Sequence, residues 1–345
     1  MNEGNIVRAG SMRRFTIAVA ALVGLLATAC FQDFDFNADH KADYVVVEDN
    51  TWTDLATGRV IYTSDDDQTV EDWPVPGDWD GDGFADAAVV RPNGDWDTGD
   101  ALGTFSFPKP AELPGFEAGF SFQRLPVPAD YDGDGALDAA WYRESDATWF
   151  IQGEAPVQFG SGPTQPPSPW DSRSIADEYD YDFPVPADYD GDGKADLSTF
   201  NPRTSDWIVR SSSDGTVSTV TMAGNERLAM PVPADYDGVG HAQRAVYGHN
   251  GWFIDGHSGP DLFGANSPTS WGGYPAVADY DGDDRADLSY VDTNSGTWHT
   301  KGSAQTFQVD DIQFGHWPVA TGYSLRSNFA RLTYLGECLT EPHHC

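Results

Sequence analysis

Short apolar segments and acidic, glycine-rich segments alternate along this 345-residue chain. The apolar segments, such as ADAAVVRP (85–92) and LDAAWYRE (137–144), combine small, β-branched and aromatic residues and end in turn-forming residues. This composition and length are typical of β-strands rather than of helices. A Pro-Val-Pro segment, or a close variant, precedes most of the acidic stretches, and its prolines exclude a helix there as well. The pattern therefore predicts an all-β protein.

The acidic segments are six copies of one nine-residue motif, D-x-D-x-D-G-x-x-D, in complete or degraded form. They are DFNADHKAD (35–43), DWDGDGFAD (78–86), DYDGDGALD (130–138), DYDGDGKAD (188–196), DYDGVGHAQ (235–243) and DYDGDDRAD (279–287). A tryptophan follows each opening aspartate by 17 to 19 residues, at Trp52, Trp96, Trp149, Trp207, Trp252 and Trp298. Such regular spacing indicates a repeat protein whose tryptophans pack in the core, with ligand stacking as the alternative.

Each repeat reads as a Pro-Val-Pro strand, the acidic loop, a second strand, a polar turn, a third strand with the tryptophan, and a fourth strand. Four antiparallel strands in ~45 to 50 residues match one β-propeller blade. An incomplete seventh copy follows, because Trp317-Pro318-Val319-Ala320 resembles the first strand and FARLTYLG (329–336) resembles the second. We therefore prefer seven four-stranded blades, with six blades and a redundant half-repeat as the alternative.

The chemistry of the loops points to Ca²⁺. Carboxylates at positions 1, 3, 5 and 9, with a carbonyl at position 7, supply hard oxygen ligands, and the glycines supply the turn. An EF-hand begins in the same way, but it needs a glutamate at position 12 and flanking helices, which this chain lacks. Turn formation alone does not explain four acids within nine residues, since these acids repel one another without a cation.

The repeated unit resembles a known family. Phe-Gly pairs at 159–160, 263–264 and 314–315, the Pro-Val-Pro-Ala segments and the aspartate loops are similar to the FG-GAP or VCBS repeats of α-integrin head propellers and of bacterial exported proteins. The resemblance covers roughly residues 31–336. It implies that the loops hold Ca²⁺ on one face of the propeller, while ligands meet the opposite face.

Carried over to this chain, the family pattern assigns four strong calcium sites. Their ligands, with a backbone carbonyl at the fourth residue of each set, are Asp78, Asp80, Asp82, Phe84 and Asp86; Asp130, Asp132, Asp134, Ala136 and Asp138; Asp188, Asp190, Asp192, Lys194 and Asp196; and Asp279, Asp281, Asp283, Arg285 and Asp287. The first loop, with Asp35, Asn37, Asp39, Lys41 and Asp43, has one charge fewer and should bind more weakly. The loop that begins at Asp235 has Val239 and Gln243 at positions 5 and 9, so we expect it to be empty.

Charge narrows the choice of partners. The chain has 55 acidic and 19 basic side chains and a formal net charge of -36. This makes nucleic acid and anionic membrane surfaces poor partners. We expect a monomer that meets a protein or a carbohydrate at the cell surface.

The N-terminus predicts export. Residues 1–29 contain two arginines followed by the apolar run FTIAVAALVGLLATA, which is typical of a signal peptide and short for a membrane span. Cleavage after an A-x-A site would release the protein, whereas cleavage before Cys30 would leave a lipid anchor on that cysteine. We favour the anchor, because Cys338 and Cys345 can then form a disulfide in the tail at 337–345.

Two long connections between repeats, 105–120 and 161–182, carry aromatic side chains among prolines. We select Phe116, Trp170 and Tyr179 in them as candidate ligand-binding residues, with simple capping of the blades as the alternative. No catalytic motif is present, so an enzyme is not predicted. The sequence thus favours an exported, calcium-binding propeller that binds or adheres to a protein or glycan. An extracellular polysaccharide lyase or hydrolase on the same scaffold is the alternative.

Overall fold

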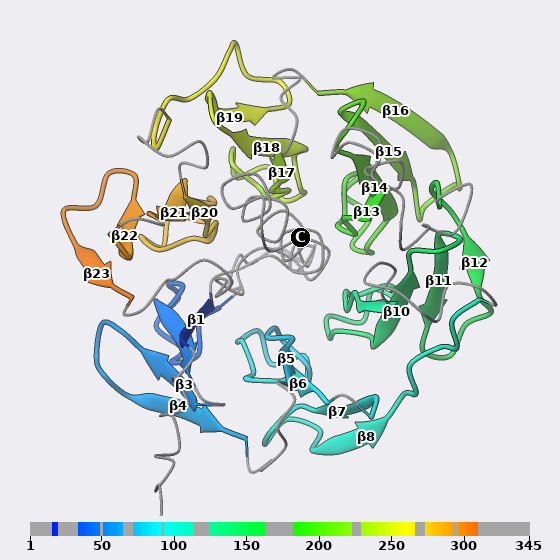
Figure 1. The fold of residues 1–345 in the computed structure, drawn as a ribbon, viewed down its shortest axis with the longest axis horizontal. Coiled ribbons are helices and arrows are strands. Elements are labelled where there is room, and N and C mark those ends of the chain that lie inside the picture. The colour runs from blue at the N-terminus through cyan, green and yellow to red at the C-terminus, as the bar shows by residue number, and fades with distance from the viewer. Residues whose placement is uncertain are drawn as a thin grey trace, which may run out of the picture.

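A computed structural model describes residues 16–19, 34–48, 51–64, 72–91, 93–113, 124–162, 182–222, 229–265, 273–292 and 295–309. Their strands form six antiparallel sheets that lie around a common centre as a ring (Figure 1). The prediction of an all-β propeller is confirmed, and the described residues show the six-blade alternative. None of the described residues belongs to a helix with the length and hydrophobicity that a membrane crossing needs.

The sheets follow one another along the chain. The first contains β1 (Thr16–Val19), β2 (Val45–Glu48), β3 (Thr51–Asp54) and β4 (Val60–Thr63); the second β5 (Trp73–Pro74), β6 (Val89–Val90), β7 (Asp95–Asp97) and β8 (Thr104–Ser106); the third β9 (Arg124–Pro126), β10 (Ala140–Arg143), β11 (Thr148–Ile151) and β12 (Val157–Gln158). The fourth contains β13 (Phe183–Pro184), β14 (Leu197–Asn201), β15 (Asp206–Arg210) and β16 (Val217–Thr221); the fifth β17 (Met230–Pro231), β18 (Ala245–Gly248) and β19 (Gly251–Ile254); the sixth β20 (Tyr274–Pro275), β21 (Ser289–Val291), β22 (Thr297–Thr300) and β23 (Thr306–Gln308). In the fifth sheet an isolated bridge between Trp252 and Asp261 stands where the other sheets have a fourth strand.

The first strand of most blades ends at a proline. β5, β9, β13, β17 and β20 all stop there, since a proline has no N–H to continue the ladder. β1 is the exception, because it lies within the predicted export signal and pairs with β2, with Thr16 opposite Glu48. The seventh copy at 317–336 lies outside the described residues.

The recurring tryptophans form the core, as predicted. Trp52, Trp96, Trp149, Trp207, Trp252 and Trp298 are all at most 1% exposed. A buried indole N–H usually has a hydrogen-bond partner, and among these six tryptophans Trp52 is the exception. In the third and fifth blades that partner is the carbonyl of the Phe-Gly phenylalanine, Phe159 or Phe263, whereas in the fourth and sixth it is the hydroxyl of Ser198 or Ser289. The Phe-Gly motif therefore fixes a core tryptophan.

The sixth blade packs directly on the first. The rings of Tyr44 and Tyr280 stack with centroids 4.4 Å apart, and both lie edge-on to the indole of Trp298. The backbone N–H of Ala42 donates to the carbonyl of Asp279 at 2.7 Å. These contacts join the first and last blades and leave no place for another blade between them.

Candidate metal-binding loops

The first aspartate of each loop organises the backbone around it. In the second loop, Asp78 Oδ1 accepts from the N–H of Gly81 at 2.7 Å, and Asp78 Oδ2 accepts from the N–H of Gly83 at 2.8 Å. Both glycines have positive φ, 77° and 88°, which suits this tight turn. The openings of the third, fourth and sixth loops repeat these bonds. The local sequence thus folds each motif into the same turn.

The residue at position 9 closes the turn from the other side. Asp86 Oδ2 accepts from the N–H of Trp79, at position 2, at 2.9 Å, and the equivalent bond occurs in all six loops. Burial raises the pKa of the position-9 carboxyls to about 6; these carboxyls are Asp43, Asp86, Asp138, Asp196 and Asp287. Neighbouring aspartates add to this rise in the complete loops. A nearby cation would stabilise the ionised form of such a carboxylate.

The side chain at position 2 links the loop to the segment before it by a hydrogen bond. The side chain there is Trp79, Tyr131, Tyr189, Tyr236 or Tyr280 in the second to sixth loops, and each donates to the backbone carbonyl four residues earlier at 2.6 to 2.9 Å. These side chains are mostly buried, so the bonds lie away from water. The acids are thereby held on a rigid support.

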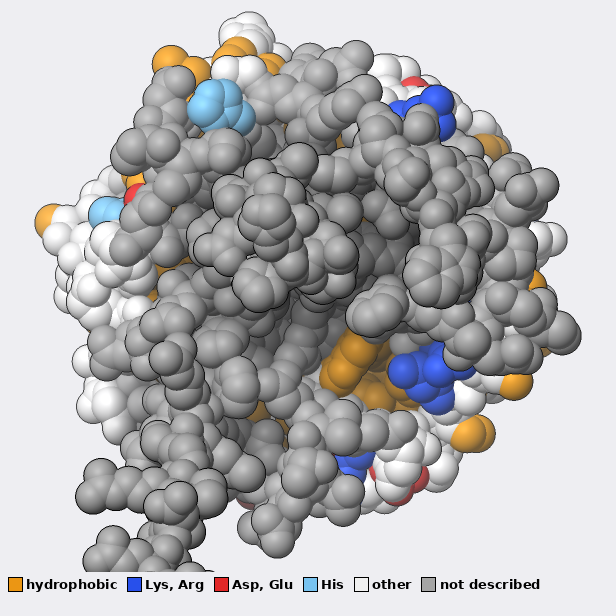
Figure 2. Space-filling view, in the orientation of Figure 1, with side chains coloured by type: hydrophobic (Ala, Val, Ile, Leu, Met, Phe, Trp, Pro, Cys, Tyr) orange, Lys and Arg blue, Asp and Glu red, His pale blue; other side chains and the backbone are white. Residues whose placement is uncertain are grey.

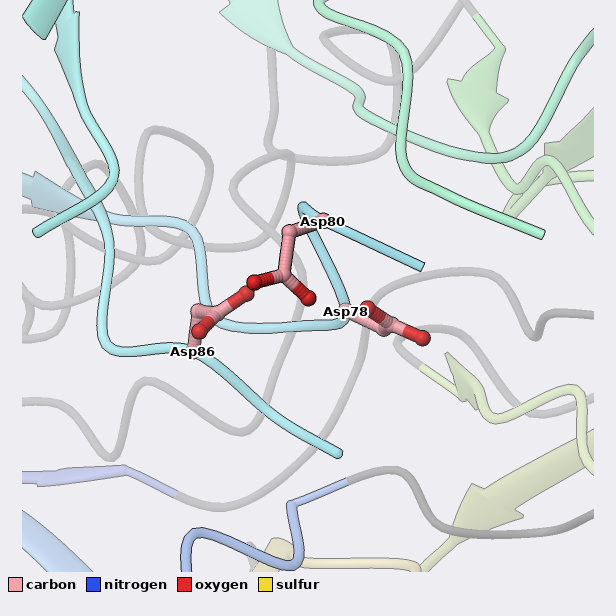
Figure 3. A group of neighbouring side chains, drawn as sticks. All are labelled: Asp78, Asp80 and Asp86. Atoms are coloured by element: carbon pink, nitrogen blue, oxygen red, sulfur yellow. The ribbon is translucent and has the colours of Figure 1, made fainter. Parts of the chain in front are cut away.

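Three carboxylates converge in each of the four complete loops. Oxygens of the aspartates at positions 1, 3 and 9 lie within 4.8 Å of one another in the groups Asp78, Asp80 and Asp86; Asp130, Asp132 and Asp138; Asp188, Asp190 and Asp196; and Asp279, Asp281 and Asp287. In Figure 3, Asp80 and Asp86 point toward one another, with Asp78 beside them at the start of the loop. Each group could hold a metal ion. The described residues therefore hold four Asp-rich clusters, one in each complete loop.

The acids at position 5 take a different part in the loop. Asp82 Oδ1 accepts from the N–H of Phe84, and Asp134 and Asp192 accept in the same way from the N–H of Ala136 and Lys194, at 2.9 to 3.0 Å. These acids, like Asp283, lie outside the groups of converging carboxylates. In this structure they brace the N–H of position 7, the residue whose carbonyl the family pattern assigns as a ligand.

The two degraded loops replace carboxylates by amides. In the first loop, Asn37 Nδ2 donates to Asp43 Oδ1 at 2.5 Å. In the fifth loop, Gln243 keeps the bond to the N–H of position 2 with its carbonyl oxygen and donates through Nε2 to Asp237. His257 Nε2 lies 3.1 Å from Asp237 Oδ1 on the other side. Protein donors therefore surround the acid that a cation would otherwise balance.

The fourth loop is covered by a serine-rich turn that the sequence pattern did not single out. The hydroxyls of Ser211 and Ser213 donate to Asp190 Oδ2, and that of Ser212 donates to Asp192 Oδ1. These hydrogen bonds lower the pKa of Asp190, although partial burial acts in the opposite direction. His257 occupies a comparable turn in the fifth blade. Both turns lie about 20 residues from their loops, so only the fold reveals the contact.

Backbone hydrogen bonds join the six loops into a closed collar. The N–H of position 8 in each loop donates to the carbonyl of position 1 in the loop before it. The pairs are Ala85 to Asp35, Leu137 to Asp78, Ala195 to Asp130, Ala242 to Asp188, Ala286 to Asp235 and Ala42 to Asp279, at 2.7 to 3.0 Å. The last pair closes the circle. Lys41 strengthens that closure, since its Nζ donates to the carbonyl of Asp281 at 2.6 Å.

Six residues singled out in the sequence lie outside the described residues. They are the candidate ligand-binding residues Phe116, Trp170 and Tyr179, the candidate lipidation site Cys30, and the candidate disulfide partners Cys338 and Cys345. They stay predictions.

Comparison with known proteins supports the repeat assignment. Residues 78–141 match the model of the FG-GAP-like repeat family. A solved structure of an Agrocybe aegerita lectin, described as recognising non-reducing terminal N-acetylglucosamine, is 17% identical with a TM-score of 0.39; the match covers 64% of this chain and 61% of the lectin chain. No curated protein matches the sequence. The matched region holds the second and third loops, so the described residues form a β-propeller that contains FG-GAP-like repeats.

Proposed function

We propose that the four complete loops bind Ca²⁺ as a structural ion. Their donor sets contain only oxygen, three of the carboxylates already converge, and the position-9 acid is buried or partly buried with its pKa raised to about 6. These are the properties of a site for a hard cation. The ion would neutralise acids that otherwise repel one another within a single turn.

The first and fifth loops fit this ion less well. Asn37 offers one neutral oxygen in place of a carboxylate, so we expect weaker binding there. The fifth loop has lost two carboxylates, with Val239 at position 5 and Gln243 at position 9, and Gln243 donates to one of the two acids that remain, Asp237, so we expect no calcium there. The proposed complement is thus four strong sites, one weak site and one metal-free loop.

We further propose that the protein is an exported binding module, in which the calcium loops support the ring and the opposite face meets a protein or glycan. The observation that carries this is the closed collar, because it occupies one end of the blades with structural contacts all the way round. The other end of the blades, where for example β9 begins and β10 ends, is left to bind. Export and a lipid anchor on Cys30 belong to this proposal; the mature chain would then lack β1, and β2 would be the first strand of that blade. Mass spectrometry of the membrane fraction tests both by the mass of the N-terminal peptide.

The test of the binding function is a screen of immobilised glycans and cell-surface proteins with the full chain in ~1 mM calcium. We expect binding that is lost after chelation and restored by calcium, because the ion supports the scaffold. The screen would be repeated with Asp86→Asn and with Asp237→Asn, which alter a complete and a metal-free loop. Binding of no glycan or protein in the presence of calcium would contradict the proposal.

A further inference from the structure

Three basic side chains gather at one end of the third blade, which we call the basic cluster: Lys109, Arg124 and Arg143. Arg124 begins β9 and Arg143 ends β10, and the two are direct partners across the strand pair. The third acidic loop joins the opposite ends of these strands, so the basic cluster lies at the end away from the loops. In Figure 2, basic and hydrophobic side chains lie together on the viewed face over β10.

The arrangement of the two arginines costs free energy by itself. Like charges directly opposite one another in an antiparallel pair destabilise the sheet. Asp146 offsets one of them, since it accepts from Nε and Nη2 of Arg143 at 2.9 and 2.7 Å. Among the described residues the only acid paired with Arg124 is Glu112, with Nη1 and Oε2 at 3.9 Å, which is too long for a hydrogen bond. One positive charge of the pair is therefore poorly compensated.

Two buried polar atoms beside Arg124 have no hydrogen-bond partner among the described residues. They are Nε of Arg124 itself and Oε2 of Glu112, whose side chain is only 4% exposed. The other oxygen of Glu112 is held by the hydroxyl of Ser145 and the N–H of Leu113. A buried unsatisfied polar atom is rare and costly in a folded protein. Glu112 is thus fixed in place, and the guanidinium beside it is only partly exposed, with its Nε buried and without an acceptor.

Lys109 adds a second open cation. Its Nζ lies 5.4 Å from the ring centroid of Trp73 and 5.6 Å from that of Trp141, and it makes no hydrogen bond to the described residues. Burial, together with the charge of Arg124, lowers the pKa of Lys109 to about 8. Within the described residues, the ammonium group thus lies beside two indoles and its three N–H donors are unused.

A cleft elsewhere in the described residues holds basic side chains of which two are paired with acids. This cleft, of about 480 Å³, lies between the fifth and sixth blades and is lined by His257, Asp261, Arg285 and Lys301 among others. There Lys301 is paired with Asp261 and His257 with Asp237. In the basic cluster the ammonium of Lys109 has no such partner within the described part of the chain, and the partly exposed guanidinium of Arg124 comes no nearer to Glu112 than 3.9 Å. Charge complementarity therefore favours the basic cluster as the place for an external anion.

We propose that the basic cluster binds the carboxylate of an acidic saccharide, with Lys109 and Arg124 as its donors and the partly exposed indole of Trp73 beside the sugar ring. A carboxylate suits the planar donors of arginine, and charge-assisted hydrogen bonds of this kind are among the stronger ones. A sugar places apolar C–H groups next to the same carboxylate, which matches the hydrophobic surface beside the cluster. This inference rests on the proposed function as a binding module and names the ligand class for that face.

The test is calorimetric titration of the full chain, in calcium, with the trimer of galacturonic acid and with the neutral trimer of galactose. Lys109→Met removes the charge but keeps an unbranched side chain, and Arg124→Gln removes the guanidinium. The matched controls are Lys301→Met and Arg210→Gln, which alter the same residue types elsewhere. We expect the acidic trimer to bind, the neutral trimer to bind at least about tenfold more weakly, and each cluster variant to lose about tenfold or more. The controls should bind as the unaltered chain does.

Each contrary result has a defined meaning. Equal affinity for the two trimers, or the same affinity in Lys109→Met and in the unaltered chain, overturns this inference. If the chain binds only neutral glycans or proteins in the wider screen, the binding-module proposal stands and the acidic-saccharide inference fails. A melting curve of each variant shows that it is folded, so that loss of binding is attributed to the removed charge.

Discussion

Removing calcium should lower the stability of the propeller by an amount set by the number of occupied loops. Extracellular calcium modules have dissociation constants on the order of 10⁻⁴ to 10⁻³ M, so ~1 mM calcium contributes roughly 0.4 to 1.4 kcal/mol per site. Four complete loops therefore contribute about 2 to 6 kcal/mol to the free energy of unfolding. For a chain of this size that corresponds to a change in Tm of about 4 to 20 °C.

The assay is thermal unfolding, followed by circular dichroism, in ~1 mM calcium and again in chelator. The loops themselves provide a matched pair of variants. Asp86→Asn removes a converging carboxylate from a complete loop and should reduce the calcium-dependent part of the Tm difference by one site's share. Asp237→Asn changes the loop that is held by Gln243 and His257, so it should lower Tm equally in both buffers.

Two results would refute this reasoning. The same Tm in calcium and in chelator would show that the converging aspartates hold no ion. A calcium-dependent loss in Asp237→Asn as large as that in Asp86→Asn would show that the fifth loop is a calcium site after all. Magnesium serves as the control ion, because its small, rigid coordination shell suits this loop poorly.

Four further predictions concern protonation and packing. In calcium-free buffer the pKa values of the position-9 acids are raised from 3.8 to about 6, so these acids contribute stability that is complete below about pH 4 and is lost as the pH rises through 6. The Tm should therefore be higher at about pH 5 than at about pH 7. The reverse order would contradict the raised pKa values. His257→Ala should cost about 0.5 to 1 kcal/mol in denaturant unfolding, with or without calcium, since its pair with Asp237 is partly exposed. Trp207→Ala should cost about 3 to 5 kcal/mol, because it leaves a cavity in the core. Lys109→Met should leave Tm unchanged or raise it, since it removes a partly buried charge that no described residue hydrogen-bonds; a clear fall would mark Lys109 as a structural cap on the indoles.

The structural features that depend on a local sequence pattern could be predicted from the sequence. The spacing of the tryptophans, such as Trp149 and Trp207, located the core because each blade buries one at the same point. The alternating aspartates likewise located the converging carboxylates, because Asp78 and Asp86 are brought together by the turn between them.

Contacts between segments that are far apart along the chain could not be predicted from the sequence. The number of blades depends on the bond from Ala42 to Asp279, which joins the two ends of the ring, whereas the copy at 317–320 suggested a seventh unit. The role of His257 was also missed, since a lone histidine in a turn gives no signal of the aspartate it faces. The basic cluster was missed for the same reason, because its members are separated by 15 and 19 positions and meet only through the pairing of β9 with β10.

The collar has no first or last link. In an open row of repeats the terminal unit has one neighbour and can peel away by breaking one set of contacts. Here every loop donates to one neighbour and accepts from the other, so a blade can leave only by breaking two links at once. Because those links are made by backbone atoms, the fifth blade keeps its place without a metal ion. Fraying from an end, the usual route by which proteases enter a repeat array, therefore has no starting point along this rim of the molecule.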